Sequence, residues 1–206
     1  MSPFVSLITA SLAMAASGSG QSWEKVRAKD GVAVWTRPSP GSDLVEMRAE
    51  TVLPTSAPAV WAVLSEPHRF DSFMPYTLQT RLLERHESGL VVYIVTDPPV
   101  VSRRDVTVSY TKRVDESRGL YRLEFREANG KAPRLPDGVV RMTRMRGQWM
   151  VKAIDAKRCR VRYQVHAEPG GLVPAFLANA QASGALTDVL VRLRARVVAR
   201  DGKQPG

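Results

Sequence analysis

The stretch that decides the fold is AEPGGLVPAFLANAQASGALTDVLVRLRARVVAR, residues 167–200. It leaves a strand-like segment through Pro169, Gly170 and Gly171, and then large apolar residues recur at helical spacing: Leu186, Val189, Leu190, Leu193 and Val197. The spacing predicts a long C-terminal helix. Its first half carries alanine, serine and glycine, where a helix that only packs would gain more by burying leucine. These small side chains leave space next to the first half of the helix, and that space calls for an explanation other than packing.

Upstream of this helix, the chain is predicted to form a series of strands. Apolar and polar residues alternate in successive segments between residues 76 and 168, with turn-forming clusters between them, which predicts an antiparallel sheet with one covered face. The residues that share the apolar face are Val106, Val108 and Tyr110; Tyr121, Leu123 and Phe125; and Val161, Tyr163 and Val165. The predicted class is α+β, a curved antiparallel sheet around one long C-terminal helix.

Three strands and a short helix are predicted before this series of strands. Lys29-Asp30-Gly31 is a hairpin signal between two early strands, and a third strand is predicted over LVEMRAETV, residues 44–52. A short helix is predicted over SAPAVWAVLSEP, residues 56–67, with Thr55 or Ser56 as its N-cap and Pro67 ending it. No linker separates these elements from the rest, so one domain is expected.

Composition limits the choice of partner. The 206 residues carry a formal net charge of +10, which favours an anionic partner such as a membrane surface, a nucleic acid or an acidic protein. The strand arginines alternate with apolar residues without exposed aromatic rings between them, so we expect no nucleic-acid binding. The arginines near the end of the chain, which are Arg192, Arg194, Arg196 and Arg200, suit the helix dipole and also anionic lipid head groups.

The N-terminus resembles an export signal. Residues 4–16, FVSLITASLAMAA, form an apolar run too short to span a bilayer and end in small residues, with Ala13-Met14-Ala15 similar to a cleavage site. The preceding Met1-Ser2-Pro3 lacks the usual positive charge, which leaves a mis-assigned start or a disordered tail as alternatives. We expect residues 1–21 to be a signal peptide, residues 22–200 the domain, residues 201–206 a tail, and the mature protein periplasmic or secreted.

Few side chains indicate chemistry. The sequence lacks the common zinc, phosphate-loop, dinucleotide and nucleophile-elbow motifs, and Cys159 is its single cysteine. We expect His68, His86 and His166 to be solvated, no metal site and no cofactor. Arg104 differs, because alternation places it on the apolar wall, where a buried charge needs a carboxylate such as Asp97 or a polar group of a ligand. A bulge after Pro98-Pro99 would instead expose it.

Two stretches together resemble the START domain, the lipid-transfer module named after the steroidogenic acute regulatory protein. They are PPVVSRRDVTV, residues 98–108, with an Arg-Asp pair opening a strand, and AEPGGLVPAFLANAQASGAL, residues 167–186, with a Pro-Gly-Gly turn before the last helix. WEKVRAKDGVAVWTR, residues 23–37, also fits the family pattern, and the resemblance covers about residues 22–198. Val106 stands where the family often has an aromatic residue, which leaves the ligand open.

The resemblance implies a helix-grip fold with a hydrophobic tunnel between the sheet and the last helix. The tunnel would hold one lipid, sterol or other apolar molecule, and the small residues of the helix would leave volume for it. The ligand-binding residues expected on this basis are Arg104, Val108, Tyr110, Tyr121, Phe125, Tyr163, Phe176, Ala180 and Gly184. Close contact between helix and sheet, with no cavity, is the alternative.

Three functions fit these expectations. The first is a non-enzymatic, monomeric carrier whose Arg104 orients the polar end of the ligand, with transient contact to an anionic membrane. The second is an enzyme, since the helix-grip superfamily includes cyclases and aromatases that would need acid and base groups in the cavity. The third is a basic domain that binds membranes or proteins and has no cavity.

Overall fold

The structure is a computed structural model that describes residues 22–99 and 101–201; in the last helix the side chains of residues 176–178, 180–182 and 201 lie outside the description. The strands are β1 Glu24–Lys29, β2 Val32–Ser39, β3 Ser42–Leu53, β4 Thr77–His86, β5 Gly89–Thr96, β6 Arg104–Asp115, β7 Leu120–Glu127, β8 Val140–Arg141, β9 Arg144–Asp155 and β10 Arg158–Glu168. The helices are α1 Ala57–Leu64 and α2 Ala175–Asp201, with the short 3-10 helices η1 Pro67–Ser72 and η2 Asn129–Lys131.

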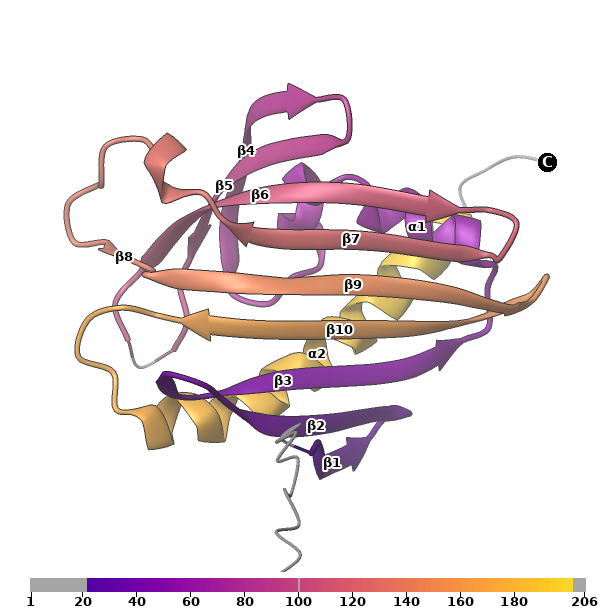
Figure 1. Cartoon of the computed structure of the whole chain (residues 1–206), viewed down its shortest axis with the longest axis horizontal. Coiled ribbons are helices and arrows are strands. Elements are labelled where there is room, and N and C mark those ends of the chain that lie inside the picture. The colour runs from indigo at the N-terminus through magenta and orange to yellow at the C-terminus, as the bar shows by residue number, and fades with distance from the viewer. Residues whose placement is uncertain (1–21, 100, 202–206) are drawn as a thin grey trace, which may run out of the picture.

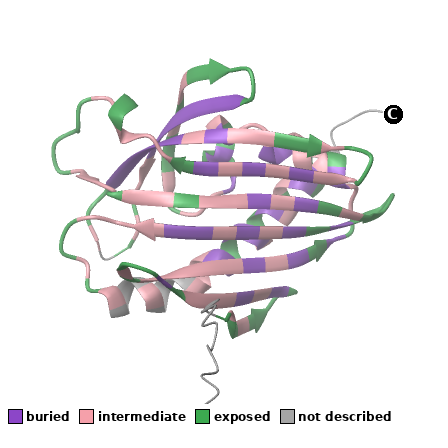
Figure 2. Cartoon of the chain, viewed as in Figure 1, coloured by how far each residue is buried: buried purple, intermediate pink, exposed green. Residues whose placement is uncertain are grey.

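The strands form one curved sheet with α2 crossing behind it (Figure 1). Along the sheet the order is β1-β2-β3-β10-β9-β7-β6-β5-β4, every neighbouring pair in this order is antiparallel, and the two-residue β8 adds a parallel pair to β6. The predicted α+β helix-grip class is confirmed. Buried and less buried residues alternate along the strands (Figure 2), as the sequence pattern predicts for a sheet with one covered face.

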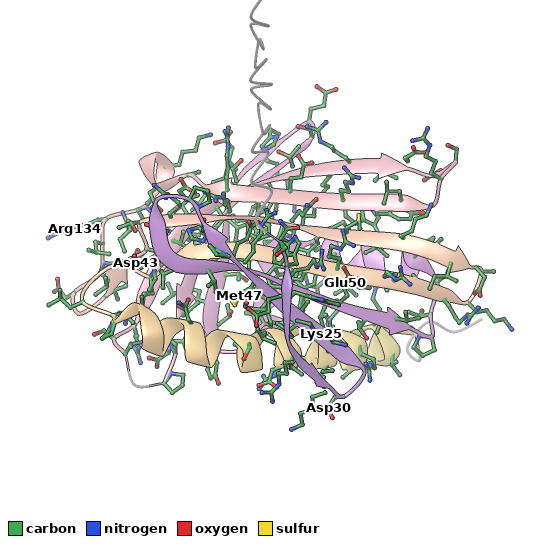
Figure 3. The ribbon with its side chains drawn as sticks, turned by 60° about the horizontal axis from the view of Figure 1, so that its bottom comes forward. Lys25, Asp30, Asp43, Met47, Glu50 and Arg134 are labelled. Carbon is green, nitrogen blue, oxygen red and sulfur yellow. The ribbon has the colours of Figure 1, made fainter. Side chains whose placement is uncertain are left out.

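Helix α2 buries its second half against the sheet. Leu186, Val189, Leu190, Leu193 and Val197 are all buried, as their helical spacing predicts. The helix contacts β2, β3 and α1. Figure 3 shows α2 running along the β1–β3 edge of the sheet, with Asp43 near its left part and Asp30 at the tip of the β1–β2 hairpin further along it.

Polar contacts hold α2 at both of these points. Asn179 Oδ1 accepts from the backbone N–H of Val45 at 3.2 Å, and near the other end Arg194 Nη2 donates to the carbonyl oxygen of Asp30 at 3.0 Å. The helix is therefore fixed along its length to the half of the sheet formed by β1, β2 and β3.

The other half of the sheet is covered by α1 and η1, a role that the sequence analysis gave to the last helix alone. Ser56 caps α1, since its hydroxyl accepts from the backbone N–H of Ala59 at 3.3 Å. After α1 ends, η1 and the residue that follows it bury Phe70 and Phe73, whose rings meet edge to face with centroids 5.0 Å apart. A short 3-10 turn has no sequence periodicity of its own, which is why this cover was missed.

The turn before α2 needs its glycines. Gly170 and Gly171 have φ values of +68° and +65°, a left-handed conformation that other residues adopt at a cost. A Cβ at Gly170 would also lie 2.5 Å from the carbonyl oxygen of Arg141, so the turn packs directly onto the end of β8. This packing places the turn beside β8, and the first turns of α2 then lie against β3, where Asn179 bonds to the backbone of Val45 and Asp43.

Candidate functional site

A cavity of about 220 Å³ lies between η1 with its following loop and the inner face of the sheet. Aromatic rings supply much of its wall: Phe70, Tyr76, Tyr110, Phe125, Trp149 and Tyr163. The remaining lining is Met74, Pro75, Thr77, Thr80, Ile94, Thr96, Pro98, Val106, Met142 and Met145. The described residues therefore enclose an apolar chamber of the type that binds small apolar ligands.

The aromatic wall is a set of rings in contact, contributed by strands that lie far apart in the sequence. Trp149 on β9 stacks on Tyr163 of β10 with centroids 4.1 Å apart, and Phe125 on β7 lies 6.1 Å from Tyr163. Phe70 closes the wall from η1, 6.2 Å from Trp149. Such contacts fix ring orientation and give the chamber a defined shape.

Two phenols are the main polar groups deep in this wall. Burial raises the pKa of both Tyr110 and Tyr163 well above the usual value, so both stay protonated at neutral pH. Neither hydroxyl makes a hydrogen bond to a residue that the structure describes. Both are therefore free to donate to a polar atom of a bound molecule.

Three of the predicted ligand-binding residues meet at this cavity: Tyr110, Phe125 and Tyr163. Val108 does not line it, although it is fully buried on the same strand and face. Tyr121 is also buried but packs at the α1 end of the sheet, with its ring 5.7 Å from that of Trp61. Alternation selects a face of the sheet, and it does not say how far along that face the cavity extends.

The residues predicted on α2 have different outcomes. Phe176 and Ala180 lie within the helix, but their side chains are outside the described part of the chain. Gly184 is partly exposed and does not appear among the described lining residues. A Cβ built at Gly184 would meet no described atom within 4 Å, its own helix backbone aside.

Arg104 is buried, as alternation predicts, with 5% of its surface exposed. The predicted carboxylate partner is wrong, since Asp97 pairs with the neighbouring Arg103 at 3.4 Å. Nη1 of Arg104 donates to the carbonyl oxygen of Ser102, Nε has no partner, and burial lowers the pKa of the guanidinium. Arg104 lies beside the described cavity without being part of its lining.

A buried ion pair on the opposite face of β6 was missed by the sequence analysis. Asp105 is fully buried; Arg141 donates to it from Nε at 3.0 Å and from Nη2 at 2.6 Å, and the Tyr93 hydroxyl donates at 2.9 Å. Burial, and then the bond to Asp105, raise the pKa of Tyr93 to about 12. The pair fixes β8 to β6, next to the cavity residue Met142. No local sequence motif identifies this pair, because Asp105 and Arg141 are far apart in the sequence and meet only in the folded chain.

His166 also differs from its prediction. It was expected to be solvated, but it is fully buried, with Nε2 3.4 Å from a carboxylate oxygen of Glu168. The outer face of β10 is covered here, because Arg146, paired across from His166, donates to Ser39 at the end of β2. Within the described residues, no three metal-binding side chains gather, and no helix is long and apolar enough to cross a membrane.

Residues 53–194 match the family described as "Polyketide cyclase / dehydrase and lipid transport". The chain belongs to this family. Within it, the chain is a START-type helix-grip domain, since it is 30% identical to the STAR-related lipid transfer protein of Xanthomonas axonopodis, over 85% of this chain and 98% of that structure, with a TM-score of 0.77. The resemblance to START domains is thereby confirmed.

Two more distant structures share the START-type fold. Human StAR-related lipid transfer protein 5 is 16% identical over 88% of each chain, with a TM-score of 0.77. The Zhui aromatase/cyclase from Streptomyces sp. R1128 is 17% identical over 75% of this chain and 94% of its own, with a TM-score of 0.53. The fold thus occurs in lipid-transfer proteins and in aromatase/cyclases alike, so the function has to be argued from the cavity of this START-type domain.

Proposed function

We propose that this protein binds an apolar small molecule, such as a lipid or a sterol, in its cavity and carries it without changing it chemically. The observation that supports this most directly is the wall of contacting aromatic and aliphatic side chains around about 220 Å³ of space. An empty apolar chamber forfeits packing contacts, and an apolar ligand would restore them. The free hydroxyls of Tyr110 and Tyr163 would orient the polar end of such a ligand.

The cyclase alternative needs groups that take and give protons at neutral pH. The titratable side chains among the described lining residues are tyrosines, and burial raises the pKa of Tyr110 and Tyr163. Such phenols donate hydrogen bonds well and accept protons poorly. The described chemistry of the cavity therefore favours a carrier over an enzyme.

The test is to purify the protein without detergent and identify its bound molecules by native mass spectrometry and by mass spectrometry of a solvent extract. We expect one apolar molecule per chain, recovered with unchanged mass after incubation with the protein. Conversion of the molecule would show an enzyme instead. If no apolar molecule co-purifies and none of a set of lipids and sterols binds on titration, the proposed function is wrong.

A matched pair of variants tests whether the cavity is the binding site. Val106 and Val108 lie on the same face of β6, but only Val106 lines the described cavity. We expect Val106→Phe to block binding at little cost in stability, because the ring enters empty space. Val108→Phe should overpack the core and destabilise by about 1–3 kcal/mol. Equal binding by the Val106→Phe variant and the wild type would place the ligand elsewhere.

A further inference from the structure

The feature that carries a further inference is the place of Arg104 at the rim of the cavity. Its cross-strand neighbour on β5 is Thr96, and Val106 follows it on the same face of β6; both line the cavity. On its other side it pairs with Val140 of β8, two residues before the lining residue Met142. Arg104 is thus bordered by the cavity residue Thr96 on β5, and its β8 partner Val140 lies two residues from the cavity residue Met142.

The charge of Arg104 has no protein counter-ion among the described residues. Arginine stays protonated in proteins, and this side chain is 5% exposed, with Nε buried and unpartnered. The two acids nearest in sequence are already engaged, Asp97 with Arg103 at 3.4 Å and Asp105 with Arg141 at 2.6 Å. A desolvated, unpaired cation is costly, so a group that supplies the opposite charge is strongly favoured here.

The Pro-Gly-Gly turn before α2 approaches the guanidinium. A Cβ at Gly171 would lie 3.9 Å from Arg104 Nη2 and 3.4 Å from Val140 Cγ1, so any side chain at this position would approach the guanidinium. Glycine leaves that space unfilled. The Pro-Gly-Gly turn therefore passes close to Arg104 without placing a side chain from position 171 against its guanidinium.

We propose that Arg104 is the counter-ion of an anionic head group, and that the ligand is an amphiphile with an apolar chain and a carboxylate. This rests on the proposed function and narrows it, because a neutral alcohol or ester would leave the arginine unpaired. The carboxylate would receive hydrogen bonds from the guanidinium, and the chain would extend along the aromatic wall. Arginine suits this role because its planar fork of donors matches a carboxylate.

The test compares three probes of equal chain length at neutral pH: dodecanoate, dodecanol and methyl dodecanoate. Binding is followed by tryptophan fluorescence, since Trp149 lines the cavity, and confirmed by displacement of the neutral dye Nile red. We expect the wild type to bind dodecanoate at least about tenfold more tightly than either neutral probe, as charge-assisted hydrogen bonds would give. Dodecyl phosphate is the fourth probe, and tighter binding of it would assign the anion to a phosphate.

Substitutions assign the selectivity to one residue. Arg104→Met should weaken dodecanoate binding about ten- to a hundredfold and leave dodecanol binding within about threefold of the wild type. Arg104→Lys, which keeps the charge, should retain part of the preference for the acid. The control is Arg103→Met, which removes an exposed arginine from the adjacent position and should change neither affinity.

The outcomes separate this inference from the proposed function. Equal binding of acid, alcohol and ester by the wild type would overturn the inference and leave the carrier function standing, whether or not Arg104→Met folds. Binding of none of the probes would overturn the inference, and it would contradict the proposed function as well only if no lipid or sterol binds on titration. Selectivity for the acid that persists in both Arg104 variants would assign the anion site to another residue and overturn the inference.

Discussion

At the scale of single residues, β6 carries two charges with opposite roles in adjacent positions. Arg104 is buried on the cavity side of the sheet and has no ion pair with a described acid, and Asp105 points to the other side and is paired with Arg141. Alternation places them on opposite faces correctly. It does not show that the face of Asp105 is covered here, because the cover comes from the distant segment that contains η2 and β8.

Asp105→Asn should destabilise the protein by about 3 kcal/mol or more, because it leaves Arg141 without its buried counter-charge. Urea denaturation followed by fluorescence measures this loss. The control is Asp97→Asn, whose ion pair with Arg103 is exposed and should be worth less than about 1 kcal/mol. Similar losses of stability in the two variants would mean that the buried pair contributes no more to stability than the exposed pair does.

Tyr163→Phe should weaken ligand binding about threefold to tenfold, because it removes one neutral hydrogen bond from the cavity and keeps the ring. Its stability should change little, since the hydroxyl makes no hydrogen bond to a described residue. Titration with the co-purified molecule gives the affinity, and Tyr121→Phe, away from the cavity, is the control. A large loss of stability with unchanged affinity would show a structural role for the hydroxyl.

At the scale of elements, the sheet and α2 use glycine for different reasons. Gly147 lies where β9 crosses the aromatic wall, and a Cβ there would be 2.1 Å from the carbonyl oxygen of Gln164 and 2.6 Å from the Phe125 ring. Gly184 lies in the middle of α2 beside open space. Packing on β10 therefore requires glycine at position 147, whereas no described neighbour requires it at position 184.

Alanine at the two positions should have opposite effects on stability. Gly184→Ala should stabilise by up to about 1 kcal/mol through helix propensity, because no described atom obstructs the new methyl group. Gly147→Ala should destabilise by about 1–3 kcal/mol, because backbone or ring must move. Denaturation midpoints of the two variants decide this. A destabilised Gly184→Ala variant would show that α2 packs closely at this point.

At the scale of the whole molecule, the net charge of +10 is the property with the widest consequence. Two of the arginines near the C-terminus serve the fold, since Arg194 donates to Asp30 and Arg200 Nη1 donates to the carbonyl oxygen of Ala62 at 2.9 Å. Arg192 is exposed and has no such contact among the described residues. A contact with anionic lipid would therefore depend on the summed charge more than on one cluster of arginines.

We propose that the chain is exported and that residues 1–21, which lie outside the described part of the chain, are removed on the way. Expression of the full sequence in a Gram-negative host should give a periplasmic protein whose N-terminus lies at about residue 22, because the apolar run before it has the length and small-residue end of an export signal. N-terminal sequencing of each cell fraction measures this. Recovery of chains starting at Met1 from the cytoplasm alone would contradict the proposal.

The sequence by itself determined the class of fold, the faces of the strands and the buried stripe of α2, because these follow from local periods of two and 3.6 residues. It also placed Tyr110, Phe125 and Tyr163 on the face that lines the cavity and Arg104 in the interior. Only the tertiary structure decided where along that wall the cavity lies, that η1 closes it, and that Asp105 and His166 are buried. These properties depend on segments that meet from distant parts of the chain, and no local pattern records which segment covers which face.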